Sequence, residues 1–376
     1  MAPAPRNRRH GSLLLNGAAP ALTVIMPTRN RPHQVIAQLR LFRALGFPYP
    51  VVVADSSDAV DDALAHAVEG AATYRRFAPG RGYYEKLADL LADVTTPFVL
   101  TVPDKKVTFP HAIEPLIERL RHRQADVAAV GYVVRFQRIE QDFDIFRVLF
   151  FTPSIEEEEP LRRLYHLMRR YQVSGFAVFR TQALARCAAQ AVAIEGQIFQ
   201  EIMFMSTLAL QGGIARLPVI FSLHGAEDSL TSVDQRHPLR WFVRDSPSFF
   251  RHYAVYRDAL ADCIRANAVP VPDGVDLAHL LDLIHATWLG RESDTGVINH
   301  VTRMLLGDPL PALGAERDWP GPRPVADGDL VHPAGAGARR YLWRRDVLEA
   351  EPRAEITITA ADIEAVERGL DIFYAD

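Results

Sequence analysis

Residues 22–32, LTVIMPTRNRP, decide how the chain begins to fold. Leu22–Met26 is a short apolar run rich in β-branched residues, which predicts a buried strand that ends at Pro27. The polar turn Thr28–Arg31 follows, and Pro32 suits the first turn of a helix. Apolar residues then recur at helical spacing as far as Gly46, which predicts a helix end. The chain therefore opens as strand, turn and helix.

The same alternation continues along the chain. Further apolar runs predict strands at Pro50–Ala54, Pro97–Val102, Val127–Val134, Ser174–Phe179 and Leu217–Leu223. Helical periodicity is found at Tyr83–Val94, Pro110–Arg123, Leu161–Tyr171 and Gln197–Leu210. Strands that alternate with helices through short turns predict an α/β fold, with a mostly parallel sheet and helices on both faces.

The regular pattern covers only part of the chain. From about 235 to 306 it is mainly helical, and a stretch rich in Pro, Gly and Ala follows. In the tail, Glu355–Thr359 predicts a strand, and Thr359 with Asp362 predicts the capped start of a last helix. We expect five segments: a tail at 1–20, an α/β domain at 21–225, a helical region at 226–306, a loop or linker at 307–340, and a strand and helix at 341–376.

Composition excludes several classes of protein. The chain has 376 residues, 48% of them hydrophobic and 23% charged, with a formal net charge of −4. These values are typical of a globular protein and exclude a disordered polyelectrolyte and a basic nucleic-acid binder. No apolar run reaches the length of a membrane span, and the N-terminus lacks the hydrophobic centre of a secretory signal. Cys187 and Cys263 are too few for a disulfide framework, so we expect a reduced, cytoplasmic protein.

Polar side chains follow three of the predicted strands. The turns begin with Thr28 and Arg29, with Asp55, and with Asp104. Ligands of open parallel sheets bind at the carboxyl ends of the strands, so we expect the binding site there. The chain has neither a G-x-G-x-x-G after the first strand nor a G-x-x-x-x-G-K-[ST], which leaves a dinucleotide oxidoreductase and a P-loop enzyme without support.

The lysines are clustered. Only three of the 42 basic residues are lysines, and all of them lie between Lys86 and Lys106, with Lys105 beside the latter. Lysine is a compact point charge, whereas arginine is a planar fork, so the two differ in how they bind phosphate. The cluster adjoins the third strand end and suggests a function there.

Four segments in this order resemble family 2-type glycosyltransferases with the GT-A fold, in particular a bacterial subgroup. They are TVIMPTRNRP (23–32), VVVADSSD (51–58), YYEKLADLLADVTTPFVLTVPDKKV (83–107), and SGFAVFRTQAL (174–184) together with QIFQEIMFMSTLALQGG (197–213). The similarity spans about residues 21–225, which would form the nucleotide-sugar-binding catalytic domain. It implies transfer of a hexosyl or N-acetylhexosaminyl group, with inversion, from a nucleoside diphosphate sugar. Uridine is the nucleoside by family frequency.

The resemblance also implies roles at the donor site. Pro27, Thr28 and Arg29 would line the nucleotide pocket, and Asp55 would accept a hydrogen bond from the base or ribose. Lys86 would lie on a helix that approaches the sugar or the phosphates.

For the chemistry, Asp104 would be the first acidic residue of the D-x-D motif. Glu201 would be the catalytic base, with Glu195 as the alternative. His224 matches a region that contacts metal or diphosphate. Glu227 and Asp228, which follow it closely, would add carboxylates nearby.

The motif itself departs from the family. Related sequences have two or three aspartates where this chain has Asp104-Lys105-Lys106. Those aspartates hold Mg²⁺ or Mn²⁺ on the donor diphosphate, and a lysine cannot coordinate that cation. An ammonium group can instead neutralise the diphosphate directly. We therefore expect Lys105 or Lys106, together with Lys86, to replace the metal, so that no cofactor is required. The alternative is a metal held by Asp104 and His224.

Other interpretations stay open at this point. Loss of the metal motif is also expected in an inactive sugar-nucleotide-binding or partner protein. A nucleotidyltransferase is a third class, although Thr28–Pro32 lacks the glycines of its usual loop. The acceptor would be a small molecule, a glycan or a carrier-linked group, with no nucleic acid involved, and a membrane-peripheral location is compatible with it. Asp55 and Asp104 could also be ordinary turn residues. The aromatic residues of 241–256 suit a helix core better than a sugar platform.

Overall fold

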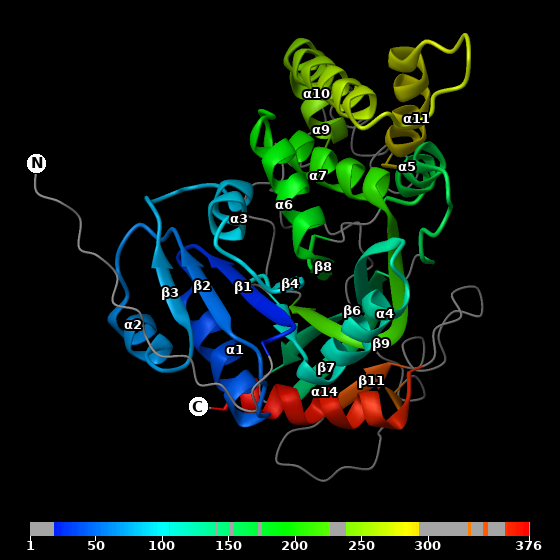
Figure 1. Ribbon diagram of the computed structural model, residues 1–376. Helices are drawn as coiled ribbons and strands as arrows, with labels where there is room; N and C mark the ends of the chain where they lie inside the picture. The colour runs from blue at the N-terminus through cyan, green and yellow to red at the C-terminus, as the bar shows by residue number, and fades with distance from the viewer. Residues whose placement is uncertain are drawn as a thin grey trace, which may run out of the picture.

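The structure is a computed structural model that describes residues 19–104, 106–139, 142–150, 153–171, 175–225, 238–292, 330–331, 341–344 and 358–375. A curled, mixed sheet forms the centre, with helices on both of its faces (Figure 1). The predicted α/β class is confirmed. The domain boundaries stay predictions, and the expected tail and linker lie almost entirely outside the described residues.

Residues 22–101 build the parallel part of the sheet. Its elements are β1 (Leu22–Thr28), α1 (Pro32–Ala44), β2 (Val51–Asp55), α2 (Asp62–Val68), β3 (Thr73–Arg76), α3 (Tyr83–Leu91) and β4 (Phe98–Thr101). The strand order is β3-β2-β1-β4, and all three pairings are parallel. β1 is buried along its whole length, as its continuous apolar sequence predicts. The carboxyl ends of these strands therefore meet at one edge.

Residues 106–225 add strands that are mostly antiparallel to their neighbours. This part comprises β5 (Lys106–Thr108), a single 3₁₀ turn (Pro110–Ala112), α4 (Ile113–His122), β6 (Asp126–Ile139), β7 (Asp142–Phe150), α5 (Pro160–Arg169), β8 (Val178–Arg180), α6 (Thr181–Val192), α7 (Gln197–Gln211) and β9 (Gly213–Gly225). β8 runs antiparallel between β4 and β6. β9 pairs in parallel with β6 and antiparallel with β5, which brings the start of β5 beside the end of β9.

The C-terminal part is helical, with one short addition to the sheet. It contains α9 (Pro238–Arg244), α10 (Ser246–Ala266), α11 (Leu277–Glu292), β10 (Leu330–Val331), β11 (Tyr341–Arg344) and α14 (Ala360–Phe373). The aromatic segment forms two helices, because Asp245 caps α10 by accepting a hydrogen bond from the Ser248 amide. The capping box that Thr359 and Asp362 predict is confirmed. The strand predicted before it lies largely outside the described residues.

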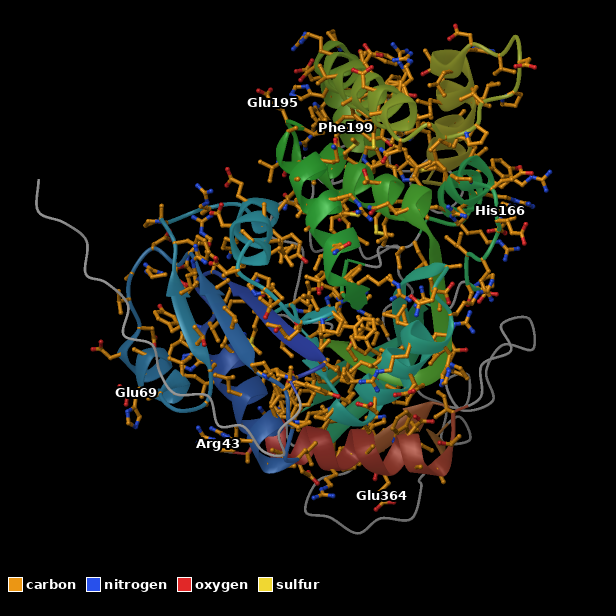
Figure 2. The ribbon with its side chains drawn as sticks, in the orientation of Figure 1. Arg43, Glu69, His166, Glu195, Phe199 and Glu364 are labelled. Atoms are coloured by element: carbon orange, nitrogen blue, oxygen red, sulfur yellow. The ribbon has the colours of Figure 1, made fainter. Side chains whose placement is uncertain are left out.

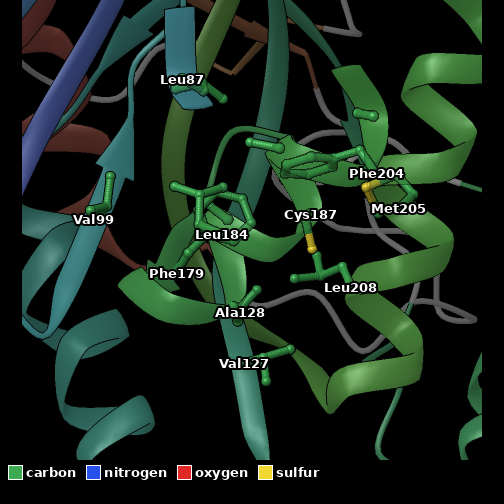
Figure 3. Packing of buried hydrophobic residues seen from close by; sticks show 14 of the residues in the cluster. Leu87, Val99, Val127, Ala128, Phe179, Leu184, Cys187, Phe204, Met205 and Leu208 are labelled. Atoms are coloured by element: carbon green, nitrogen blue, oxygen red, sulfur yellow. The ribbon is translucent and has the colours of Figure 1, made fainter. Parts of the chain in front are cut away.

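Two apolar clusters hold the elements together. In the larger one, α6 and α7 pack against the sheet through side chains such as Phe179, Leu184, Cys187 and Phe204 (Figure 3). In the smaller one, Leu370 of α14 and other apolar residues close the opposite side against α1. Both cysteines are free and buried. Among the described helices, none is both long enough and apolar enough to cross a membrane.

Candidate functional site

The edge formed by β1, β2 and β3 places three polar side chains in register. Thr28 at the end of β1 pairs with Asp55 at the end of β2, and Asp55 pairs with Arg76 at the end of β3. β4 lies on the other side of β1, and two residues separate its end from Asp104. The turns that the sequence singles out thus lie at a single edge of the sheet.

Asp104 links the turn after β4 to the turn after β1. Its Oδ2 accepts a hydrogen bond from the Thr28 hydroxyl at 3.0 Å and one from the Arg29 amide at 3.4 Å. Its Oδ1 pairs with the Arg31 guanidinium at 3.2 Å. The carboxylate is only 10% exposed. Both of its oxygens are therefore engaged by groups of the protein.

Asp55 is buried and bonded on both oxygens. Oδ1 accepts hydrogen bonds from the amide and the hydroxyl of Ser57, while Oδ2 accepts from the Tyr74 hydroxyl at 2.6 Å and from Arg76 at 2.8 Å. Burial alone would raise the pKa of Asp55, but the bonds from Ser57 and Tyr74 and the charge of Arg76 lower it. A ligand can bond to Asp55 only if one of these donors moves. Asp55 thereby orders Ser57 and Arg76 at the site.

Lys86 lies beneath the edge and holds two strand ends together. Its ammonium donates to the carbonyls of Thr28 at 2.9 Å and Ala54 at 3.2 Å and to the Ser56 hydroxyl at 3.0 Å. These three bonds match the three donors of an ammonium group. Burial lowers the pKa of Lys86 to about 8, although the negative charges of Asp104 and Asp55 act to raise it. In this arrangement Lys86 fixes the shape of the edge, and its expected contact with phosphate stays a prediction.

Polar contacts with Asp58 fix the conformation of the turn after β1. Asn30 adopts a left-handed conformation, with φ of 57°. Its side-chain Nδ2 donates to Asp58 Oδ2 at 2.7 Å, and the backbone amide of Asp58 donates back to the side-chain oxygen of Asn30 at 2.9 Å. The Arg29 guanidinium also pairs with Asp58, and its side chain is 55% exposed. Arg29 is thus more exposed than Arg31, the other cation of this turn, while Pro27 lies buried within β1.

Lys106 lies at the start of β5, opposite His224 of β9. Its ammonium stands 4.1 Å from the centre of the Phe176 ring, a cation–π contact. Burial and the neighbouring charge of Arg216 lower the pKa of Lys106 to about 7. Lys105, by contrast, lies outside the described residues.

Glu201 lies on α7, where its Oε1 accepts a hydrogen bond from the Tyr171 hydroxyl at 3.0 Å. Burial raises the pKa of Tyr84 on α3, and the nearby charge of Glu201 raises it further. The adjacent Tyr83 donates to the Gly175 carbonyl at 3.2 Å. Glu201 thus lies near Tyr171 and Tyr84, and the neighbouring Tyr83 connects this group to Gly175.

The Gly175 carbonyl connects the tyrosines around Glu201 to the surroundings of Lys106. Gly175 also accepts a hydrogen bond from the Thr101 hydroxyl at 2.7 Å, and the next residue is Phe176, on which Lys106 stacks. The segment 175–176 therefore lies between the tyrosines around Glu201 and the end of β4.

Glu195, the alternative base, has a different environment. It is 91% exposed and approaches His252 of α10 at 3.8 Å. Figure 2 shows it at the outer end of the turn before α7, beside the helices of the C-terminal part. Glu227 and Asp228 lie outside the described residues. Within the part of the chain that is described, no group of three or more His, Cys, Asp and Glu side chains gathers as metal ligands would.

Several residues of the site do not stand out in the sequence. Tyr74 and Arg76 belong to β3, whose sequence TYRR has no apolar alternation to reveal it. Tyr171 ends a predicted helix and Phe176 lies within a predicted strand, and neither pattern indicates that these two residues belong to the site. The pairing of Arg31 with Asp104 joins residues far apart in the chain, so no local pattern predicts it.

Comparisons with known proteins give distant structural similarities. No family model matches the sequence, and no curated protein matches it. Residues 1–349 of TarS from S. aureus are 16% identical, with a TM-score of 0.45 over 74% of this chain and 73% of that one. TarS 1–349 in complex with UDP-GlcNAc is also 16% identical, with a TM-score of 0.45 over 72% of this chain and 72% of that one.

A third solved structure is more distant still. Glucosyl-3-phosphoglycerate synthase from Mycobacterium tuberculosis, in complex with Mn²⁺, UDP and glucosyl-3-phosphoglycerate, is 16% identical. Its TM-score is 0.34 over 55% of this chain and 70% of that one. Similarities this distant do not identify an activity, so the function proposed below rests on the geometry of the strand ends.

Proposed function

We propose that the chain is a glycosyltransferase that moves a sugar from a nucleoside diphosphate sugar to an acceptor nucleophile, with inversion and without a divalent metal. The observation that carries the proposal is the convergence of Thr28, Asp55 and Asp104 at one edge of the sheet. Arg29, Arg31 and Arg76 bring guanidinium groups to that edge. Such an edge suits an anionic donor, and Glu201 would be the base that faces the acceptor.

The nucleotide would occupy the turns after β1 and β2. Arg29 is the exposed cation there, and Ser57 and Arg76 are held in place by Asp55. Cations and hydroxyl groups fixed in advance bind a phosphorylated ligand with little loss of conformational entropy. Uridine is proposed from the resemblance of the sequence alone.

Lys106 would neutralise the leaving diphosphate. A buried ammonium on an aromatic face, with Arg216 nearby, is a poorly solvated positive region. An anion placed there gains more from the charge than it would in water. Negative charge on the departing diphosphate would also favour the protonated form of Lys106, whose pKa is lowered to about 7.

Glu201 would act as the general base. As the acceptor oxygen or nitrogen bonds to the anomeric carbon, its proton passes to the Glu201 carboxylate. The bond from that carbon to the diphosphate oxygen breaks, and its electron pair leaves with the nucleoside diphosphate. The hydrogen bond from Tyr171 fixes the carboxylate in one orientation, which a general base requires. The expected cytoplasmic location, where such donors would be used, stays a prediction.

A panel of ligands tests this function. Thermal unfolding is followed with nucleoside diphosphates and their sugars, each with EDTA and with MnCl₂, because a ligand of the folded state raises Tm. Release of nucleoside diphosphate, by hydrolysis with water as the acceptor or by transfer to an added sugar, is then measured with the donors that bind. We expect UDP-sugars to raise Tm equally in both conditions and UDP to be released. Binding without release would indicate a non-catalytic sugar-nucleotide-binding protein, and pyrophosphate release from a nucleoside triphosphate would indicate a nucleotidyltransferase.

A further inference from the structure

Arg31 lies against the carboxylate that would hold a metal ion in the related sequences. Its Nη1 is 3.2 Å from Asp104 Oδ1, while the Thr28 hydroxyl and the Arg29 amide bond to Oδ2. The Asp104 carboxylate is thus held from two sides, and a guanidinium completes its surroundings. A positive charge already occupies the position beside Asp104.

The residues present do not fit a divalent cation at this place. Mg²⁺ and Mn²⁺ need oxygen ligands with lone pairs directed at the ion. Asp104 directs its oxygens to N–H and O–H donors instead, and the next two residues of the motif, Lys105 and Lys106, are cationic. A metal would have to displace Arg31 and then face like charges.

We propose that the guanidinium of Arg31 takes the place of the metal ion and binds the diphosphate of the donor. The inference rests on the proposed function, because it concerns the same site. Asp104 would act as the positioning residue that orients the guanidinium. Arg31 would then be a second cation besides Lys106, on the other side of Asp104.

The guanidinium has the means to bind a second anion. It carries five N–H donors in a rigid fork, and the bond to Asp104 uses Nη1. The Arg31 side chain remains 29% exposed, so a ligand can reach it. Planar forks bind phosphate oxygens in pairs, which gives orientation as well as charge.

The adjoining helix adds to the same charge. Arg31 is the residue before α1, a helix of 13 residues with no acidic residue in its first turn. The partial positive charge at the start of α1 is therefore not cancelled by its own side chains. The Arg31 guanidinium therefore adds its charge to that of the helix start.

Calorimetric titration with UDP, in EDTA and in MnCl₂, tests the inference with four variants. Arg31→Gln removes the charge and keeps a polar side chain, while Arg31→Lys restores the charge. Asp104→Asn removes the carboxylate charge that a metal would need. Arg43→Gln, at the other end of α1 (Figure 2), is the matched control for loss of an arginine from this region.

We expect wild type and Arg43→Gln to bind UDP equally with and without Mn²⁺. Arg31→Gln should weaken binding about tenfold or more in EDTA, as expected for loss of a charge-assisted hydrogen bond. Arg31→Lys should recover part of that loss, because it restores the charge but not the planar fork. Asp104→Asn should weaken UDP binding less than Arg31→Gln does, because the guanidinium remains but loses the carboxylate that orients it, and the effect should be equal in EDTA and in MnCl₂. Thermal unfolding without ligand shows whether each variant is folded.

Three results would overturn the inference. One is unchanged UDP affinity in Arg31→Gln, which would leave Arg31 a purely structural partner of Asp104. The second is loss of binding in Asp104→Asn together with a requirement for Mn²⁺ in the wild type, which would show a metal site. The third is a wild type that binds no nucleoside diphosphate in either condition. This result refutes the proposed function itself. The titration of the wild type alone distinguishes it from the other two results.

Discussion

The Tyr171 hydroxyl donates a hydrogen bond of 3.0 Å to Glu201 Oε1, joining the end of α5 to α7. Tyr171 is buried, so the direction of this bond is fixed by packing. The carboxylate beside it has a defined orientation, whereas Glu195, six residues earlier, is almost fully exposed. The two candidate bases therefore differ in a way that substitution can separate.

Glu201→Gln should abolish most of the transfer without affecting donor binding. The amide keeps the shape of the side chain and can still accept the Tyr171 bond, but it cannot take a proton. We expect kcat to fall by about 10²–10⁴-fold, the usual contribution of a general base. UDP affinity should stay within about twofold. Glu195→Gln, assayed in parallel by release of UDP, should retain full activity; the reverse outcome would assign the base to Glu195.

Tyr171→Phe should change the pH profile rather than remove activity. A hydrogen bond to a carboxylate stabilises its ionised form. Without that bond, the acid limb of the kcat profile should move to higher pH by about one unit or less, the equivalent of a single hydrogen bond. The measurement is kcat between pH 5 and 8 at saturating donor. An unshifted profile would mean that Tyr171 does not act through Glu201.

Lys106 should make donor binding depend on pH. Because its pKa is lowered to about 7, the ammonium loses its proton as the pH rises above that value. UDP affinity should then fall by up to about tenfold per pH unit above 7, as expected when one proton is linked to binding. Lys106→Met should bind weakly and lose the dependence centred near pH 7, so that any dependence left near pH 8 belongs to Lys86. Methionine removes a buried charge at similar volume, so the variant should fold at least as stably as the wild type.

Titration of UDP from pH 6.5 to 9 checks this prediction. Any pH dependence of UDP affinity that Lys106→Met abolishes belongs to Lys106. Equal wild-type affinity at both ends of the range would contradict the role given to its ammonium.

His285 should make the helical part sensitive to acid. Its Nδ1 donates to the Leu281 carbonyl at 2.7 Å, so its Nε2 accepts the hydrogen bond of 2.6 Å from Tyr256. The Tyr256 oxygen is also 2.9 Å from the Ser206 hydroxyl on α7. Burial lowers the pKa of His285 to about 4 from an ordinary value of 6.5. This chain of bonds holds α7, α10 and α11 together only while the imidazole is neutral.

The sign of the effect follows from proton uptake. Between pH 4 and 6.5 the unfolded chain binds the proton at His285 and the folded chain does not, so stability rises with pH across this window. The loss on acidification is on the order of 3 kcal/mol at most. Urea unfolding of wild type and His285→Gln at pH 4.5 and 7.5 measures it. The gap in stability between the two proteins should narrow at the lower pH; a constant gap would contradict the assignment.

Much of the sheet can be predicted from the sequence because buried parallel strands are nearly continuous apolar runs. β1, β2 and β4 are such runs, and their ends carry Thr28, Asp55 and Asp104. Because the carboxyl ends of parallel strands share one edge, the strand pattern alone is enough to predict that these residues meet. Thr359 and Asp362 are predictable for a different reason, because a capping box is a purely local interaction.

The rest depends on tertiary contacts that no local pattern encodes. β3 is a partly exposed edge strand without apolar alternation, so the sequence does not reveal that Arg76 bonds to Asp55. The sequence predicts that Lys86 faces phosphate, but the direction of its ammonium depends on carbonyls of two other strand ends. The contact between Lys106 and Phe176 joins segments 70 residues apart, and sequence spacing cannot show it.

The proposed mechanism requires that the turns after β1, β2 and β4 bind a nucleoside diphosphate without a divalent ion. A crystal structure of the chain grown with UDP in excess EDTA tests this requirement most directly. We predict that the diphosphate lies within hydrogen-bond distance of Arg31 and in contact with Lys106, with the nucleoside over the turn that carries Ser57. A UDP bound elsewhere, or bound only after Mn²⁺ is added and then bridged by the metal to Asp104, would contradict it.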